Sequence, residues 1–318
     1  MPRQHLSILG WLAAAVALTL TAVSDASLPS YQAVAPDQIT LDNVRMPTIS
    51  VPSEPFGLIY AKQMKIAFVS LNKEIEGSAL GLLNTSTFAA ELIHQITLAL
   101  LYVSLEGGLG IGLTHDGRHV LIGAGPGLVV VDVARAVTGC DDAVVGSLNG
   151  TVGDATTGNY AIEVTITSHD EYAFVSQEYG AGLSDTTGNI DVIKLHKPIA
   201  NGSVTGEAIG HLNLGCAVVG SALSPNGRFL YAVSETTTAN DTTPGSFSVI
   251  DVEILKKTPS KALLHSVPAG CGLVRLLVSA DGKIVWATAR ESNHLLAFNA
   301  TKLQSPPRTA DNALLASL

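Results

Sequence analysis

A unit of about 55 residues recurs five times along the chain and constrains its fold more than any other feature. Each copy has a short apolar run and a turn, a second run ending in small polar residues, and a third run closing on Asp or Asn. The turns fall at positions 63, 116, 170, 226 and 281, so successive copies lie 53, 54, 56 and 55 residues apart. Such regular spacing indicates one repeated supersecondary unit and argues against a β-sandwich.

The runs within each unit are predicted to be short strands. Asp-Gly and Asn-Gly at 116–117, 226–227 and 281–282 are pairs that tight hairpin turns prefer, and helical periodicity is weak throughout. A fourth run follows in most units, as at residues 144–148 and 263–267. Four short strands joined by turns form a propeller blade. We therefore predict an all-β fold, a β-propeller of about five four-stranded blades over residues 55–318.

The first 26 residues are typical of a signal peptide. Arg3 and His5 give a weakly basic start, residues 6–23 are apolar or small, and Ser24 and Ala26 are small residues at the −3 and −1 positions of a cleavage site. An uncleaved signal anchor is the alternative, because an apolar stretch of this length almost spans a bilayer. We favour cleavage, which predicts an extracellular, secreted protein with no membrane segment.

Five N-x-[ST] sequons follow this leader. On exposed turns of an exported eukaryotic chain they are predicted to carry glycans. The net charge is −9 with no basic cluster, which argues against nucleic acid and anionic membranes as partners. The sequons lie at Asn84, Asn149, Asn201, Asn240 and Asn299.

Three cysteines are too few for a fold built on disulfides, so we expect a hydrophobic core to hold the chain together. Cys216 and Cys271 each lie ten residues before the turn of their unit and occupy equivalent positions in neighbouring units. A disulfide requires Cα atoms within about 7 Å, and innermost strands of adjacent blades are often farther apart. The spacing is therefore compatible with a Cys216–Cys271 disulfide or with two free thiols. Cys140 is expected to be free.

Two stretches of the fourth unit resemble a known repeat. Residues 222–233 (ALSPNGRFLYAV) and 247–252 (FSVIDV) resemble the repeats of YVTN-type β-propellers. That group is similar in fold to lactonase-type propellers and to the haem d1 propeller of nitrite reductases. The leader, the sequons and residues 270–275 (GCGLVR) resemble secreted fungal members. The resemblance implies a fold and not one activity, because the group hosts several.

Two units depart from the pattern. In the third, Asp170-Glu171 lacks the Gly, and Lys194 stands where other units have Asp132 and Asp251. In the first, Gln63-Met64 replaces Asp-Gly.

Closure of the ring has two candidate strands. Residues 45–51, within an N-terminal segment 27–54, resemble a fourth strand and are predicted to complete the last blade. Residues 312–318 resemble the fourth strand of the fifth unit. If both form, there is one fourth strand more than five units need, as expected for a ring shortened from six or seven blades. A five-bladed ring is the alternative.

Charges on innermost strands are the strongest functional signal. In a propeller, the loops between blades and those after the second strand share one end of the channel, where a ligand is expected. Glu163 and Arg275 are charged where other units are apolar or Gly, and a buried charge must be paired or hydrated. Arg275 either binds an anionic ligand or closes an ion-pair network, and we favour the network. The candidates at this end are Phe56, Glu163, Glu178, Glu235, Arg275 and Arg290.

No catalytic motif accompanies these residues. There is no G-x-S-x-G, H-E-x-x-H, C-x-x-C, P-loop or G-x-G-x-x-G motif, and the glycines of residues 107–112 are expected to allow close packing near the axis. His115 and His169 are assigned to the same turn position, which indicates the repeat and not a metal site. We predict a scaffold that binds a small ligand or protein segment, without cofactor or metal. A lactonase-like hydrolase and a haem-binding propeller are the alternatives.

Overall fold

The computed structural model describes residues 48–72, 78–87, 90–98, 107–125, 127–150, 161–178, 187–196, 204–236, 244–305 and 312–318. All of them belong to one compact unit, Ala33–Leu318. In this part of the chain no helix is long and apolar enough to cross a membrane. The predicted signal peptide and the sequons at Asn201 and Asn240 lie outside the described residues.

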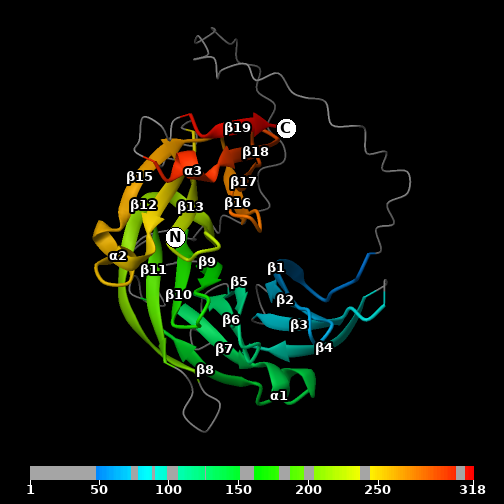
Figure 1. The fold of residues 1–318 in the computed structure, drawn as a ribbon. Coiled ribbons are helices and arrows are strands. Elements are labelled where there is room, and N and C mark those ends of the chain that lie inside the picture. Colours follow the sequence, from blue (N-terminus) through cyan, green and yellow to red (C-terminus); the bar gives the residue numbers. More distant parts are fainter. Residues whose placement is uncertain are drawn as a thin grey trace, which may run out of the picture. The chain divides into compact units, whose positions relative to one another are not determined.

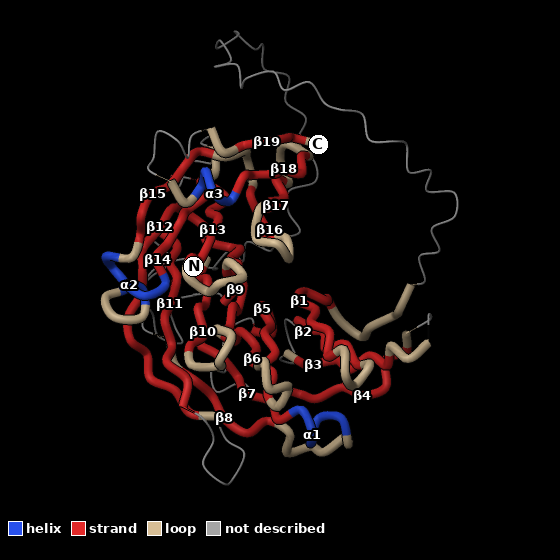
Figure 2. Tube along the Cα trace, in the orientation of Figure 1, coloured by secondary structure: helices blue, strands red, loops and turns tan. Residues whose placement is uncertain are grey.

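The described chain folds into five antiparallel blades of four strands each, numbered 1 to 5 and arranged one after another around a common axis (Figures 1 and 2). This confirms the predicted all-β propeller architecture. Blade 1 contains β1 (Glu54–Ala61), β2 (Ile66–Asn72), β3 (Ala79–Asn84) and β4 (Glu91–Thr97), and blade 2 contains β5 (Gly107–Leu113), β6 (His119–Ala124), β7 (Gly127–Asp132) and β8 (Val144–Leu148). Blade 3 contains β9 (Ala161–Ile166), β10 (Tyr172–Gln177), β11 (Thr187–His196) and the first part of β12 (Thr205–Leu223). Blade 4 contains the rest of β12, β13 (Phe229–Thr236), β14 (Ser246–Asp251) and β15 (Leu263–Pro268), and blade 5 contains β16 (Leu273–Val278), β17 (Ile284–Ala289), β18 (His294–Asn299) and β19 (Leu314–Ser317).

Strand β12 belongs to two blades. Its first part pairs with β11 of blade 3 and its second part with β13 of blade 4, so the two blades form one seven-stranded sheet. Ala217, where the chain passes from one blade to the next, has a φ of 52°, a left-handed conformation unusual for a residue with a side chain. The repeat alone predicts two separate strands here.

The Asp or Asn that closes the third strand caps a short helix. The side chains of Asp132, Asp251 and Asn299 accept the backbone N–H three residues on, which satisfies a free donor of the first helical turn. In blade 3, Lys194 offers no such acceptor, and β11 continues to His196. The helices are α1 (Val133–Val137), α2 (Val252–Leu255), with the 3-10 helix η2 (Pro259–Lys261) after it, and α3 (Ala300–Leu303).

The turn between the first and second strands is the same in three blades. Its first residue is a Ser or Thr whose hydroxyl donates to the Asp or Asn two positions on and accepts the N–H five positions on. Gly at the fourth position has a φ of 68° to 70°, which strains other residues. The turns begin at Thr114, Ser224 and Ser279, so the predicted positions 116, 226 and 281 occupy matching corners.

The turn of blade 3 is displaced by one residue from its predicted alignment. It begins at Thr167, whose hydroxyl accepts the N–H groups of Glu171 and Tyr172. Asp170 is therefore the fourth residue, matches Gly117 and has a φ of 56°. His169 matches Asp116, so the prediction that His115 and His169 share a position is wrong. In blade 1, Gln63 lies in the turn as predicted, with the positive φ at Lys65.

Each pair of neighbouring blades encloses its own apolar core. The junction of blades 4 and 5 is the most aromatic: Phe247 lies between Tyr231 and Phe298, with ring centroids 5.7 Å and 5.1 Å away. Near the axis the strands approach more closely. A Cβ on Gly110 would lie 2.7 Å from the backbone nitrogen of Glu163, which confirms that the glycines of β5 allow tight packing.

The predicted closing strand is wrong in the part that the structure describes. Residues 48–51 form no strand, and Ile49 and Val51 pack on the apolar face of blade 1 formed by Ala67, Val69 and Leu71. Blade 5 is completed by β19, which pairs with β18. The other candidate, residues 312–318, therefore supplies the fourth strand of the last blade.

Candidate functional site

Arg275 of β16 reaches the innermost strands of three other blades. Its Nη1 donates to the carbonyl oxygen of Val219 on β12 at 2.9 Å and lies 3.3 Å from Oε2 of Glu163 on β9. Its guanidinium carbon lies 5.1 Å from the ring centroid of Phe56 on β1. Two other predicted residues, Phe56 and Glu163, therefore meet at the side chain of Arg275.

Local backbone structure positions Arg275. The pairing of β16 with β17 shifts register between Leu273 and Leu276, and the N–H of Arg275 donates to Oγ1 of Thr288 at 3.0 Å instead of to a strand carbonyl. Gly220 on β12 allows β16 to come close, since a Cβ there would lie 2.6 Å from the carbonyl oxygen of Val274. The bulge and the glycine together place the guanidinium against Val219.

Glu163 titrates near neutral pH. Burial raises its pKa from 4.5 to about 7, because the charged form loses hydration. Arg275 and the backbone N–H of Val164 act in the opposite direction but do not cancel this effect. Glu163 therefore exists in both protonation states at pH 7, unlike an ordinary surface carboxylate.

Two of the remaining candidates form a second ion pair. Arg290, after β17, lies 3.5 Å from Glu235 on β13, and 62% of its side chain is exposed. Glu178 is half-buried at the end of β10. The predicted residues thus provide two inter-blade ion pairs, Glu163–Arg275 and Glu235–Arg290. Among the described residues, no three His, Cys, Asp or Glu side chains are grouped to hold a metal.

The cysteines are all free thiols. Cys216 lies within β12 and pairs in register with Thr187 and Thr236, whereas Cys271 lies exposed between β15 and β16. Of the two alternatives, the structure therefore has two free thiols and no Cys216–Cys271 disulfide. Equivalent positions in neighbouring blades do not bring these side chains together.

Three of the five sequons lie in the described chain. Asn149 is exposed after β8. Asn84 and Asn299 are half-buried and use Oδ1 to accept the N–H groups of Ser86 and Lys302. A glycan is attached to Nδ2, so these hydrogen bonds do not prevent modification. Glycosylation stays a prediction.

The structure also has a cavity that the sequence did not indicate, at the turn end of the blades. It has a volume of about 430 Å³ and is lined by the turns of blades 3 and 4, by α2 and by His115. None of the candidates at the channel end lines it. Two of its charged side chains are paired with each other: Lys256 Nζ lies 3.0 Å from Oε1 of Glu253, and 5.4 Å from the ring centroid of Tyr172.

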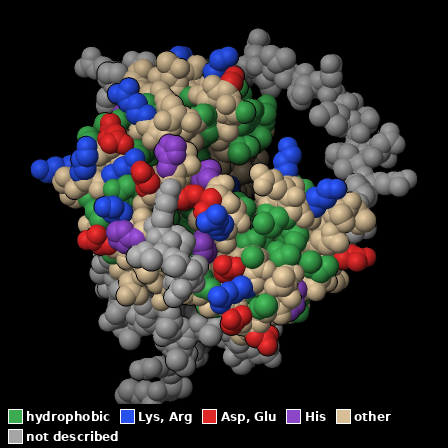
Figure 3. All heavy atoms as spheres, turned by 60° about the horizontal axis from the view of Figure 1, so that its bottom comes forward, with side chains coloured by type: hydrophobic (Ala, Val, Ile, Leu, Met, Phe, Trp, Pro, Cys, Tyr) green, Lys and Arg blue, Asp and Glu red, His purple; other side chains and the backbone are tan. Residues whose placement is uncertain are grey.

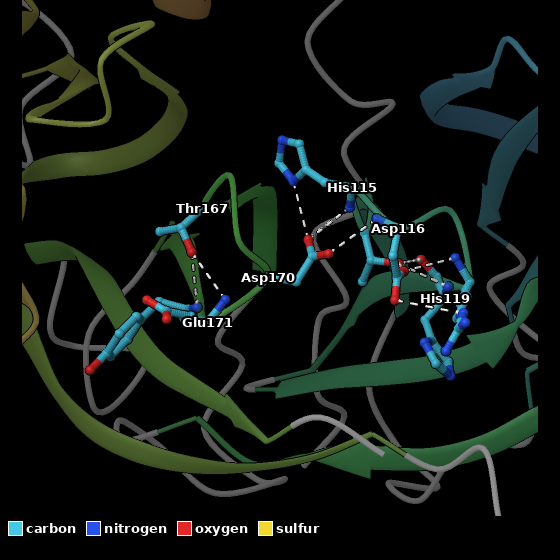
Figure 4. A network of polar contacts seen from close by, with 9 residues as sticks. His115, Asp116, His119, Thr167, Asp170 and Glu171 are labelled. Atoms are coloured by element: carbon cyan, nitrogen blue, oxygen red, sulfur yellow. Dashed lines mark hydrogen bonds and ion pairs between the residues drawn. The ribbon is translucent and has the colours of Figure 1, made fainter. Parts of the chain in front are cut away.

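Beside this cavity, Asp170 ties blade 3 to blade 2 (Figure 4). Its Oδ1 accepts the backbone N–H of His115 at 2.7 Å and lies 3.1 Å from the Nδ1 of the same residue, and its Oδ2 accepts the N–H of Asp116 at 3.1 Å. The left-handed conformation of Asp170 directs the carboxylate across the junction. The missing Gly of the third turn was the sequence signal for this contact.

Comparison with known proteins identifies the fold. No family model matches the chain, and no curated protein matches its sequence. A protein of unknown function from Desulfotomaculum acetoxidans DSM 771 has a TM-score of 0.56 at 12% identity, over 80% of this chain and 68% of that one. The periplasmic gluconolactonase PpgL of Pseudomonas aeruginosa has a TM-score of 0.56 at 14% identity, over 85% and 71%. The β-propeller domain of Cps50 (Swd1) from Myceliophteria thermophila has a TM-score of 0.51 at 10% identity, over 82% and 69%. In architecture and in its structural relatives, the chain is a β-propeller.

Proposed function

We propose that the chain is an exported binding scaffold that holds a small ligand or a protein segment at the channel end of the propeller. The pairing of its charged candidates is the observation that carries this proposal. Arg275 shares its guanidinium among Val219, Glu163 and Phe56, and Arg290 pairs with Glu235. Catalysis of hydrolysis requires an acid or base, a nucleophile and a stabilising donor aimed at one point, whereas the contacts of these two arginines are ion pairs with different carboxylates.

A binding role requires less. The Phe56 ring is 42% exposed and the Arg275 side chain is 36% exposed, so an aromatic face and a cation are open to a ligand. Such a pair suits a planar or anionic group, since guanidinium binds carboxylate and stacks on aromatic rings. Benzoate combines both features and is the probe that we would use.

A lactonase-like hydrolase is the second candidate, and one observation favours it. A carboxyl with a pKa of about 7 can accept a proton from water at neutral pH, and Glu163 has such a pKa. The likeness to the gluconolactonase is one of fold alone.

Purified protein separates the two. We expect γ- and δ-lactones to hydrolyse no faster than in buffer, with or without a chelator, and benzoate to give saturable shifts in ligand-observed NMR that Arg275→Met abolishes. Lactone turnover that Glu163→Gln abolishes would establish the hydrolase. Absence of benzoate binding to the wild type would contradict the proposed binding site.

Export is tested separately. In a eukaryotic secretory host we expect the protein in the medium, beginning at Ser27, with a mobility that changes on removal of N-linked glycans. Recovery in the membrane fraction with residues 1–26 attached would show the signal anchor instead.

A further inference from the structure

The ion pair of Glu163 and Arg275 is open both to solvent and to a further hydrogen-bond acceptor. The two side chains are 27% and 36% exposed, and Oε2 of Glu163 lies 3.3 Å from Nη1 of Arg275. The same Nη1 donates to the carbonyl oxygen of Val219. A guanidinium has five N–H donors. Because both contacts use Nη1, a further acceptor can approach the other donors of Arg275.

Phe56 favours a ligand that carries a ring as well as a negative charge. Its ring centroid lies 5.1 Å from the guanidinium carbon of Arg275, and the residue is 42% exposed. A guanidinium binds a carboxylate at about 2.7–2.9 Å and also stacks on aromatic rings. A ligand carboxylate on Arg275 is therefore a close neighbour of the Glu163 carboxylate, which already lies 3.3 Å from this guanidinium. Two carboxylates so placed disfavour each other's charge.

Of the three ionisable groups in such a complex, Glu163 is the one that becomes neutral near pH 7. Arg275 stays protonated, and a ligand carboxylic acid has an ordinary pKa of about 4. Burial raises the pKa of Glu163 to about 7. Once protonated, Glu163 no longer competes for the cation, and its O–H can donate a hydrogen bond to the ligand carboxylate.

Arg275 is the charged group that acts on Glu163 from the surrounding strands. Strand β9 packs against β5, β6, β10 and β12, and Arg275 reaches it from β16. Among the titratable side chains of these elements, the charge of Arg275 is the one that shifts the pKa of Glu163. These side chains are His119 on β6, Tyr172 on β10 and Glu178 directly after it, Glu207, His211 and Cys216 on β12, and Arg275 on β16, with none on β5.

We propose that Glu163 is a built-in competitor for an anion site on Arg275, so that a small aromatic carboxylate binds when Glu163 is neutral and leaves when Glu163 regains its charge. The inference rests on the proposed function, since it concerns the same site, and it adds a ligand class and a control by pH. One proton moves: Glu163 takes it from solvent as the ligand carboxylate replaces Glu163 on the guanidinium. Because coupling is reciprocal, bound ligand also makes Glu163 hold that proton more firmly.

The rest of the protein gives an anion little general attraction. The net charge is −9, and Figure 3 shows basic side chains interspersed with acidic ones on the face that it draws. Loss of any one carboxylate makes this charge less negative, so a matched control is needed. Glu253→Gln on α2 provides it: Glu253 is 65% exposed at the turn end, and its hydrogen bond with Lys256 lowers its pKa, so it stays charged near neutral pH.

The affinity for benzoate between about pH 6 and about pH 8, where benzoate stays ionised, tests the inference. Over this range the protonated fraction of Glu163 falls from about nine-tenths to about one-tenth, so the wild-type Kd from ligand-observed NMR should rise about tenfold. Glu163→Gln should keep the affinity of the wild type at pH 6 throughout, and Glu253→Gln should follow the wild type. Benzamide, the uncharged analogue, should bind the wild type with a Kd that does not change with pH.

The outcomes separate this inference from the proposed function. Benzoate binding with a constant wild-type Kd would overturn the inference and leave the binding site in place. An equal rise in Kd for Glu163→Gln or for benzamide would also overturn it, because a change other than the charge of Glu163 would then be the cause. Binding to the wild type that Glu163→Gln abolishes would make Glu163 a contact of the ligand and not its competitor. If benzoate binds neither protein at any pH, the site and the inference both fall. Circular dichroism at each pH checks that the fold is unchanged.

Discussion

Two carboxylates near the axis, at opposite ends of the blades, have pKa values shifted in opposite directions. At the channel end, burial raises the pKa of Glu163 to about 7. At the turn end, partial burial also acts to raise the pKa of Asp116, but hydrogen bonds from the Thr114 hydroxyl and the Arg118 N–H, and the charges of His119 and Arg118, lower it overall. The difference lies in the supply of donors, because a carboxylate keeps its charge in the fold only where donors replace water.

The turn end provides donors from the backbone itself. The repeated turn directs a hydroxyl and an N–H at each Asp or Asn corner, and Asp170 receives two further N–H groups from the neighbouring blade. The channel end provides Glu163 with one guanidinium, which is shared with Val219, and with the N–H of Val164. The turn end is therefore built for stability, and the channel end retains a group whose charge responds to pH.

Substitution of Asp170 should have the largest effect on this contrast. Asp170→Ala removes the acceptor of two backbone N–H groups of blade 2 and leaves a Cβ at a φ of 56°. We expect the free energy of unfolding to fall by about 3 kcal/mol, measured by urea denaturation.

Asp170→Gly is the matched control. It also loses the carboxylate but tolerates the positive φ, so it should recover about 1 kcal/mol of that loss. Equal stability of the Asp170→Ala variant and the wild type would show that the carboxylate does not join the blades.

Glu163 should give the next largest effect, and one that depends on pH. Its pKa is about 7 in the fold against 4.5 unfolded, so between these values the folded protein binds the proton more tightly. Stability of the wild type should fall as the pH rises through this window and stay reduced above pH 7. Glu163→Gln does not titrate, so its stability relative to the wild type should increase by about 2 kcal/mol from pH 4.5 to 8, after allowance for solvent exposure of the side chain. A constant difference between the two proteins over this range would show that Glu163 has an ordinary pKa.

Local signals explain why the blades were predictable from the sequence. Turn pairs such as Asn226-Gly227 and apolar runs such as β14 act within a few residues. The Asp or Asn that closes the third run correctly marked the end of that strand, and in the structure its side chain also caps a short helix. Charge on an innermost strand likewise pointed to Glu163 and Arg275, because such a charge needs a partner.

What failed depends on contacts distant in the sequence. The one-residue displacement at Asp170 is decided by its hydrogen bonds to His115 and Asp116, more than 50 residues away. Continuity of β12 and the packing of residues 48–51 on blade 1 are likewise set by neighbouring sheets and not by local pattern. The cavity at the turn end lies between the turns of two blades, and no single turn has a sequence pattern that indicates it.

Asp116 should give a smaller effect with the opposite dependence on pH. Its pKa is lowered in the fold, so its contribution is present above the unfolded value of 3.8 and is lost as the pH falls through the folded value. Asp116→Asn keeps the acceptor that Asn226 uses at the same corner of blade 4. We expect a loss of about 0.5–1 kcal/mol at pH 7, limited by solvent because the side chain is 46% exposed. The loss should shrink as the pH falls below 3.8, and a loss that stays unchanged as the protein is acidified would mean that the charge of Asp116 contributes nothing.

Arg290→Ala should have the smallest effect, although it removes an ion pair as Arg275→Met does. Arg290 is 62% exposed and 3.5 Å from Glu235, and solvent and side-chain entropy offset such a pair almost completely. We expect a change of at most about 0.5 kcal/mol in the free energy of unfolding, and less in high salt. Arg275→Met should cost more, because it leaves the carbonyl of Val219 without its donor and the half-buried Glu163 without its cation. If the two substitutions were equally harmless, the Glu163–Arg275 pair would be no more important to the fold than a surface contact, and its place at the channel would have to be explained by a ligand.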